Sequence, residues 1–197
     1  MNIYEFDKVF FNKFNKKYNS HEEVPSHIKF YENKINSIKK QPNNICNIFW
    51  ETELLIINTI LKTFKTKKIL EIGAGIGQLS IFLKHSGIDV EACEICNDRA
   101  IDFMYFCKEF ETNVKLYQEP YQLLNLDKYD VLVGVGIGNT VNNLNKDINL
   151  LENLNNNKKI IYIEPFGYED NTMDISQDKK HFYKFLLEMQ YNFFSSL

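Results

Sequence analysis

The chain has 197 residues, of which 44% are hydrophobic and 25% charged, and its net charge is −3. This length and composition suit one domain with a single buried core. No apolar run approaches the roughly 18 residues of a membrane helix, acids stand where a secretory signal would be basic, and four cysteines do not suggest a disulfide framework. We therefore expect a cytoplasmic protein that contacts no membrane.

Apolar residues recur at helical spacing in three segments of the N-terminal third, which predicts three helices. The segments are Ile3–Phe14, Ile28–Ile38 and Ile45–Ile60. We expect them to form a helical cap over residues 1–66 that belongs to the same domain. Up to Leu70, twelve lysines face seven acids. This balance would attract an anionic substrate, but solvated helix faces also explain it.

Strand-like and helix-like segments alternate from residue 67 onward, which predicts βαβ units. The expected strands are Lys68–Ile72, Asp89–Cys93, Val114–Tyr117, Asp130–Val135 and Lys159–Glu164. The expected helices are Gln78–His85, Asp98–Phe110 and segments near Asp147–Leu154 and Asp178–Met189. The fold class is therefore α/β, with a doubly wound, mostly parallel sheet in residues 67–197 and helices on both faces. Such sheets bind ligands beyond the carboxyl ends of their strands.

A glycine-rich loop follows the first expected strand. That strand ends in Glu71, and Gly73, Gly75 and Gly77 follow at a spacing of two, so bare backbone would meet a ligand at a helix N-terminus. The pattern resembles the first motif, acid-x-Gly-x-Gly-x-Gly, of the class I S-adenosylmethionine-dependent methyltransferases, and the resemblance implies a Rossmann-like fold. A dinucleotide fingerprint would need glycine or alanine in place of Gln78. This disfavours a nicotinamide oxidoreductase, which we would expect to tolerate Gly77→Ala.

Acids after the second and third strands agree with this resemblance. Glu94 stands where the family holds both ribose hydroxyls, and Ile95 follows as an apolar surface for adenine. Glu119, before Pro120, stands where family members often receive the adenine amino group. The resemblance implies S-adenosyl-L-methionine as cofactor, S-adenosyl-L-homocysteine as product, and no metal. The implied cofactor-binding residues are Glu71, Gly73, Ala74, Gly75, Gly77, Glu94, Ile95, Glu119, Pro120 and Gly136.

The C-terminal third departs from the family pattern. The Asn/Asp-Pro-Pro-aromatic tetrad of methyltransferases for nucleobase amines is absent after the fourth strand, where Gly136 and Gly138 suggest backbone close to a ligand. Only Tyr191–Leu197 follows the last expected helix, so we expect the family's C-terminal antiparallel strand pair to be incomplete here. A homodimer could cover the sheet edge that this would expose.

The sequence does not identify a catalytic base. The sulfonium already activates the methyl group, so such a protein must mainly hold the acceptor in line and exclude water. A base is needed only if the acceptor keeps its proton until attack. The weak candidates for a base or an orienting group are Glu164, Tyr168, His21, His27 and Asn139, and both histidines are more simply interpreted as surface residues.

The interpretation that fits best is methyl transfer to an oxygen or nitrogen atom of a small molecule, anionic if the basic N-terminal third binds it. Three alternatives stay open: a noncatalytic cofactor-binding partner subunit, a methyltransferase for RNA or protein and, least favoured, a nicotinamide oxidoreductase. A nucleic-acid partner is not expected, because the chain is acidic overall and has a single arginine. A redox or metal role for the pair Cys93 and Cys96 lacks a second pair or a suitably spaced histidine.

Overall fold

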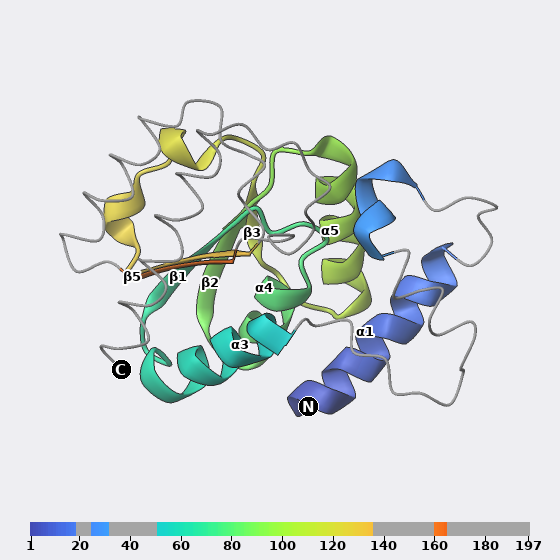
Figure 1. Cartoon of the computed structure of the whole chain (residues 1–197), viewed down its shortest axis with the longest axis horizontal. Coiled ribbons are helices and arrows are strands. Elements are labelled where there is room, and N and C mark those ends of the chain that lie inside the picture. Colours follow the sequence, from blue (N-terminus) through green and yellow to red (C-terminus); the bar gives the residue numbers. More distant parts are fainter. Residues whose placement is uncertain (19–24, 32–50, 136–159, 165–197) are drawn as a thin grey trace, which may run out of the picture.

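The computed structural model describes residues 1–18, 25–31, 51–135 and 160–164 (Figure 1). The helices are α1 (Ile3–Tyr18), the 3₁₀ helix η1 (Ser26–Tyr31), α3 (Glu51–Thr63), α4 (Gln78–His85), α5 (Asn97–Glu109) and the 3₁₀ helices η2 (Tyr121–Leu123) and η3 (Leu126–Lys128). The strands are β1 (Lys68–Ile72), β2 (Asp89–Cys93), β3 (Lys115–Tyr117), β4 (Val131–Val135) and β5 (Ile160–Glu164). No helix in these parts of the chain is long and apolar enough to cross a membrane.

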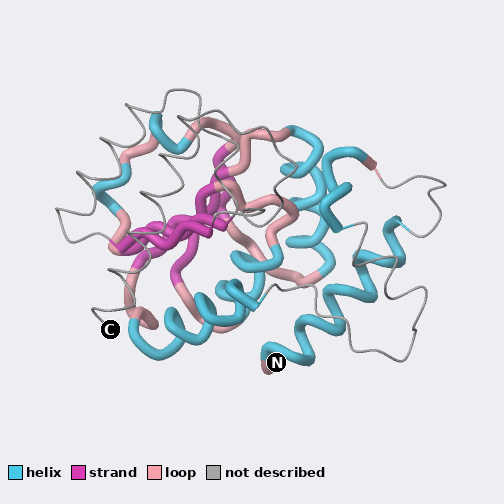
Figure 2. Tube along the Cα trace, viewed as in Figure 1, coloured by secondary structure: helices cyan, strands magenta, loops and turns pink. Residues whose placement is uncertain are grey.

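The five strands form one parallel sheet in the order β3-β2-β1-β4-β5 (Figure 2). At its centre, Ile72 of β1 pairs with Cys93 of β2 on one side and with Gly134 of β4 on the other. The strand order reverses between β1 and β4, so the C-terminal ends of these strands flank the crevice where doubly wound sheets bind ligands. This is the Rossmann-like α/β fold expected from the sequence.

The predicted core elements agree closely with the structure. β1, β2 and α4 have the predicted bounds, and β3, β4, β5 and α5 differ from them by one residue. The described start of the second predicted helix, Ile28–Ile38, needs correction, because Ser26–Tyr31 is a 3₁₀ helix, opened by a bond of 3.0 Å from the Ile28 N–H to the Pro25 carbonyl. Residues 32–38 of that prediction lie outside the described residues. The predicted helices near 147–154 and 178–189 and the C-terminal segment 191–197 lie outside the described residues.

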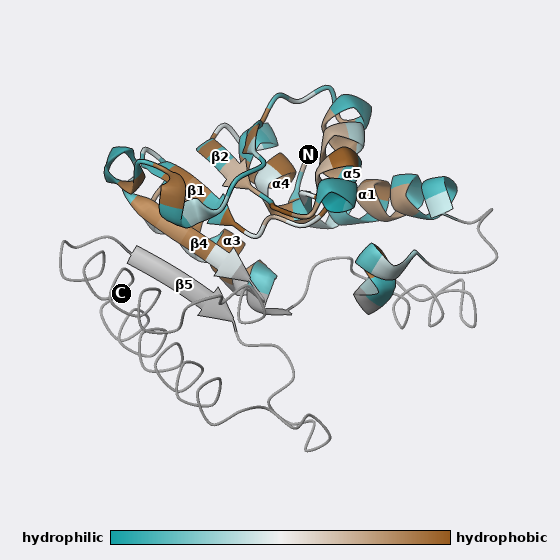
Figure 3. Ribbon diagram, turned by 90° about the horizontal axis from the view of Figure 1, so that it is seen from above, coloured by the Kyte–Doolittle hydropathy of each residue, from teal (hydrophilic) through white to brown (hydrophobic). Residues whose placement is uncertain are grey.

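Both faces of the sheet are buried. Residues paired across parallel strands point to the same side, so Ile69, Val90 and Val131 face one side together, and all three belong to the core cluster shared with the helices. Leu70 and Leu132 point to the other side and are also fully buried. Figure 3 shows this hydrophobic character in brown along β1 and β4.

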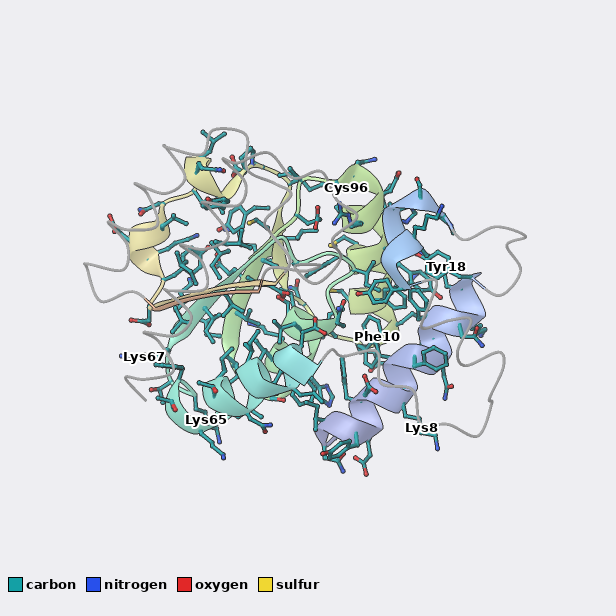
Figure 4. All side chains as sticks on the ribbon, in the orientation of Figure 1. Lys8, Phe10, Tyr18, Lys65, Lys67 and Cys96 are labelled. Atoms are coloured by element: carbon teal, nitrogen blue, oxygen red, sulfur yellow. The ribbon has the colours of Figure 1, made fainter. Side chains whose placement is uncertain are left out.

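An aromatic stripe on α1 packs against α5, as the helical spacing of its phenylalanines predicts. Phe6, Phe10 and Phe14 are all fully buried. The Phe10 ring stacks on Phe106 of α5 with the centroids 4.6 Å apart, and the Phe6 and Phe110 centroids lie 4.7 Å apart. Figure 4 labels Phe10 between the two helices. Because α1 also contacts α4, it belongs to the same core as the sheet.

Candidate functional site

The glycine loop joins β1 to α4 at the crevice and is tied to β2 by a bond of 3.0 Å from the Ala74 N–H to the Cys93 carbonyl. Gly75 has φ +58°, and a Cβ there would meet no atom of the described residues within 4 Å, so among these residues its backbone is open to a ligand. Gly77 has φ +88°, and a Cβ there would lie 2.5 Å from the Phe103 ring of α5. Packing therefore requires glycine at position 77 whatever the ligand, and the expectation that Gly77→Ala would identify a nicotinamide site does not hold.

The Glu94 carboxylate lies against the glycine loop and is 3% exposed. Its Oε2 accepts the Gly75 N–H at 2.8 Å, and its Oε1 accepts the Cys96 N–H at 2.8 Å. Nη1 of Arg99 lies 3.9 Å from Oε2. Each carboxylate oxygen has two lone pairs, so each can still accept a hydrogen bond from a ligand hydroxyl. Glu94 thus lies where its predicted role requires, and that role stays a prediction.

Glu71 is held inside the protein between β1 and α4. It is buried and accepts a hydrogen bond from the Ser80 hydroxyl. Burial raises the pKa of Glu71 to about 8, with smaller contributions from Glu53 and Glu94, although the Ser80 bonds oppose the rise. Glu71 is therefore mostly protonated at neutral pH. In this structure Glu71 contacts Ser80 inside the protein. Its predicted contact with the cofactor stays a prediction.

Three of the predicted glutamates lie close to Cys93. Burial raises the pKa of the Cys93 thiol to about 12; a bond from the Gly73 N–H opposes the rise, while Glu94, Glu71 and Glu119 add to it. The structure therefore brings these side chains together at the C-terminal end of β2. A buried thiol with such a pKa is inert at neutral pH, which gives no support to a redox role. Among the described residues, no group of three or more His, Cys, Asp or Glu could hold a metal ion.

The residues predicted for adenine lie at the surface of the loops after β2 and β3. Ile95 is 51% exposed, and Glu119 and Pro120 are exposed as well. An exposed isoleucine and an exposed acid on neighbouring loops suit a flat ring that carries an amino group. The remaining predicted residues lie outside the described parts: Gly136, Asn139, Tyr168, His21 and the side chain of Glu164, whose backbone ends β5.

A buried polar cluster beside the loop is not predicted from the sequence. Gln78 Nε2 donates to Glu53 Oε1 at 3.0 Å, and the Gln78 side chain also hydrogen-bonds the Tyr31 hydroxyl. Burial, followed by the charge of Glu53, raises the pKa of Tyr31 well above its ordinary value. The Gln78 Oε1 atom is buried and has no hydrogen-bond partner among the described residues. Of these residues, only the burial of Glu53 could have been predicted from the sequence, because Glu53 shares a helical face with the buried Ile57 and Ile60.

His27, one of the candidate catalytic residues, contacts a carboxylate on α5. Its Nε2 lies 2.9 Å from Oδ2 of Asp102, and its side chain is 17% exposed. His27 is therefore more buried than the surface residue expected from the sequence, and its partner is one that the sequence does not indicate.

No family model matches the sequence, and no curated protein is similar to it. Among solved structures, the chain is similar to the magnesium protoporphyrin IX methyltransferase of Synechocystis PCC 6803, with 14% identity and a TM-score of 0.48 over 78% of this chain and 71% of that one. It is also similar to an S-adenosylmethionine-dependent methyltransferase of Clostridium acetobutylicum ATCC 824, with 11% identity and a TM-score of 0.49 over 68% and 56%. A third is the Pyrococcus abyssi tRNA (uracil-54, C5)-methyltransferase, with 12% identity and a TM-score of 0.38 over 44% and 23%. The chain spans less than two thirds of the last two proteins, and these similarities concern the fold alone.

Proposed function

We propose that this chain is an S-adenosylmethionine-dependent methyltransferase. The observation that supports this cofactor best is the bond of 2.8 Å from the Gly75 N–H to the Glu94 carboxylate. In a dinucleotide site, the amides of such a loop bind the pyrophosphate. A carboxylate in that position repels a pyrophosphate and attracts a sulfonium cation.

The acids around the loop support the same choice. Glu53 and Glu94 are both buried beside it, and Arg99 lies 3.9 Å from Glu94. Glu71 is mostly protonated at neutral pH and adds little negative charge. S-adenosylmethionine carries a sulfonium and an ammonium group against one carboxylate, so it is a net cation. Acidic surroundings suit it better than they suit a nicotinamide dinucleotide, which carries at least two phosphate charges.

Each predicted cofactor residue has a place in this proposal. The open backbone at Gly75 receives the ligand, Glu94 accepts the ribose hydroxyls, and Ile95 and Glu119 contact the adenine. The bound cofactor supplies a methyl group already activated by the sulfonium, and transfer to an acceptor oxygen or nitrogen leaves S-adenosylhomocysteine. The residues of the chain then act by binding, orienting the acceptor and excluding water.

We further infer that the acceptor is a small molecule that offers an oxygen or nitrogen atom. Two features support this class: the sequence lacks the tetrad for nucleobase amines after β4, and α1 packs on α4, the helix that follows the loop, through Phe6 and Phe82. A helix packed on α4, as α1 is, suits a site that encloses a small ligand. The basic N-terminal third favours an anionic acceptor.

Isothermal titration calorimetry with S-adenosylhomocysteine and, separately, with NADH tests the cofactor. We expect heat of binding in the titration with S-adenosylhomocysteine and none in the titration with NADH. Glu94→Gln should weaken its binding about tenfold or more, because hydrogen bonds to a charged group contribute about 1.5–3 kcal/mol. Asp89→Asn is the matched control, since Asp89 opens the same strand and is exposed. Binding of NADH without binding of S-adenosylhomocysteine would overturn the proposal.

A transfer assay separates the enzyme from the noncatalytic partner subunit. The purified chain is incubated with labelled S-adenosylmethionine and pools of small hydroxyl- and amine-bearing acids, and S-adenosylhomocysteine is measured. We expect turnover with at least one pool. Tight binding of the cofactor, with turnover only after a second protein is added, would favour the partner subunit.

A further inference from the structure

Asp102 is a buried carboxylate on α5, and its hydrogen-bond donors in the described part of the chain all come from α1 and η1, here called the α1–η1 unit. Lys17 Nζ lies 2.5 Å from Oδ1, His27 Nε2 lies 2.9 Å from Oδ2, and the Tyr18 hydroxyl also donates to Oδ2. Lys17 Nζ lies in addition 4.1 Å from the centroid of the Tyr105 ring. Figure 4 labels Tyr18 where the end of α1 approaches α5 and η1.

The three donors keep Asp102 ionised although it is only 4% exposed. Burial alone would raise its pKa, but the hydrogen bonds from Lys17, Tyr18 and His27 outweigh burial and lower the pKa of Asp102. A buried carboxylate that loses such partners is strongly destabilising. The α1–η1 unit therefore has one favourable position on α5, the position in which its three donors meet this carboxylate.

The same short helix that carries His27 ends at the glycine-loop site. η1 finishes at Tyr31, whose hydroxyl hydrogen-bonds Gln78, the residue that begins α4 directly after the loop. Tyr31 is 1% exposed, and its ring lies 5.3 Å from that of Phe14 on α1. Fixing His27 on α5 therefore also fixes where Tyr31 meets the first turn of α4.

α5 contacts the loop at two further points. The Phe103 ring occupies the space beside Gly77, and Arg99 approaches Glu94 at 3.9 Å. Arg99, Asp102 and Phe103 follow one another at helical spacing, so a single face of α5 meets both the loop and the α1–η1 unit. A change in how that unit is seated thus reaches the loop through Tyr31 and through α5.

We propose that Asp102 is a positioning residue: it seats the α1–η1 unit so that Tyr31 and Gln78 complete the wall of the cofactor site. The proposal rests on the proposed function for its ligand. Docking of the unit and binding of the cofactor are then coupled, and by linkage each strengthens the other by the same factor. In this proposal, His27 acts through Asp102 and not as a base.

Asp102→Asn and Glu109→Gln form a matched pair of variants. Each removes one carboxylate charge from α5 that pairs with a lysine of α1, but the Lys13–Glu109 pair is surface-exposed, with side chains 28% and 36% exposed. We expect Asp102→Asn to speed hydrogen exchange in α1 and η1 at least tenfold and to weaken S-adenosylhomocysteine binding about tenfold, within the usual range of coupling between sites. Glu109→Gln should change neither by more than about twofold.

Substitutions at His27 give a second readout that a general loss of stability would not reproduce. Glutamine retains an N–H donor in place of Nε2, whereas alanine does not. His27→Gln should therefore keep most of the ligand affinity, and His27→Ala should lose part of it. Equal losses in the two variants would contradict positioning through the bond to Asp102. If Asp102→Asn does not fold, Tyr18→Phe, which removes one donor alone, takes its place.

Two outcomes separate this inference from the proposed function. If wild-type protein does not bind S-adenosylhomocysteine, the proposed function fails, but exchange at Gly75, Gly77 and Gln78 in ligand-free protein still tests positioning, since Asp102→Asn should speed it and Glu109→Gln should not. If Asp102→Asn loosens α1 and η1 while affinity and loop exchange stay at wild-type values, the positioning role is overturned. Unchanged exchange in α1 and η1 would overturn it as well.

Discussion

Glu71 beside the glycine loop and Asp102 under the α1–η1 unit expose the same fraction of their surface, 4%, yet their pKa values move in opposite directions. Among the described residues, only Ser80 donates hydrogen bonds to Glu71, so burial dominates and the acid is mostly neutral. Asp102 accepts hydrogen bonds from a lysine, a tyrosine and a histidine. Together these bonds lower its pKa by more than burial raises it. The donors and the greater depth of Glu71 inside the protein together decide which buried acid keeps its charge.

The two regions are consequently held together by different forces. The loop region depends on backbone geometry and close packing, with Gly77 against Phe103 and a neutral acid between β1 and α4. The interface of α1 and η1 with α5 combines aromatic packing with an ionised, multiply bonded carboxylate. Substitutions that act on shape should therefore affect the first region most, and substitutions that remove charge should affect the second.

The largest effect is expected from Gly77→Ala, which tests whether shape controls the loop region. A side chain at φ +88° is strained by about 1–2 kcal/mol. Overpacking against the Phe103 ring adds about 1–3 kcal/mol, so the free energy of unfolding should fall by about 2–5 kcal/mol. Urea denaturation measures it. Gly87→Ala is the control, because Gly87 has φ +82° but open space around its Cβ position, and a loss as large as that of Gly77→Ala would contradict the packing argument.

The next largest effect is the pH dependence of stability that the ionisation of Glu71 causes. Its pKa is raised from 4.5 to about 8, so between these values the unfolded chain releases a proton that the folded protein keeps. Stability is then highest below pH 4.5 and falls by about 1.4 kcal/mol for each pH unit until the folded pKa is passed. Glu71→Gln should remove this slope and make the protein about 3–3.5 kcal/mol more stable than wild type at pH 7. Chemical denaturation of both proteins from pH 5 to 8 measures the difference, and parallel curves would contradict it.

Asp102 gives the opposite sign, which sharpens the comparison. Its folded pKa is lowered, so its contribution to stability is present above the pKa of the unfolded chain and is lost as the pH falls through the folded value. Asp102→Asn should therefore reduce stability at pH 7, where Glu71→Gln increases it. If both substitutions changed stability in the same direction, the donors would not be what distinguishes the two acids.

The part of the fold that could be predicted from the sequence is the part fixed by local patterns. The apolar runs of β1 and β2 and the glycines that follow β1 specify strands and loop with little help from the rest of the chain, and their bounds agree with the structure. The 3₁₀ form of η1 was not predicted, because apolar spacing does not distinguish the tighter turns of a 3₁₀ helix after Pro25 from the start of an α-helix.

The contacts that could not be predicted join residues far apart in the chain. Asp102 has its donors 75 to 85 positions away, and Gln78 meets Glu53 25 positions away. Asp102 alone looks like an ordinary polar residue of a helix, and Gln78 was noticed only because it breaks a dinucleotide pattern. Partners of this kind are set by how the helices pack, which the periodicity of one segment does not contain.

A smaller effect than that of Glu71 is expected from Lys17→Met, which tests whether charge controls the interface of α1 and α5. The substitution keeps most of the apolar stem but removes the ammonium group that lies 2.5 Å from Asp102. The loss of a hydrogen bond to a buried charge should cost about 2 kcal/mol in unfolding free energy. Lys13→Met removes the exposed partner of Glu109 and should cost about 0.5 kcal/mol. Equal costs in urea denaturation would place the two lysines in equivalent environments.

The smallest effect is expected from Tyr31→Phe, which tests whether the two regions are joined through this one hydroxyl. The ring remains to pack on Phe14, but the bond to Gln78 is lost, at a cost of about 1 kcal/mol in unfolding free energy. Tyr121→Phe is a control at another buried tyrosine, away from α1 and η1. If Tyr31 connects the regions, the drop in ligand affinity caused by Asp102→Asn should be smaller when Tyr31 is already Phe, which a double-mutant cycle measures. Fully additive losses would mean that seating of η1 reaches the loop through α5 instead, by way of Phe103 and Arg99.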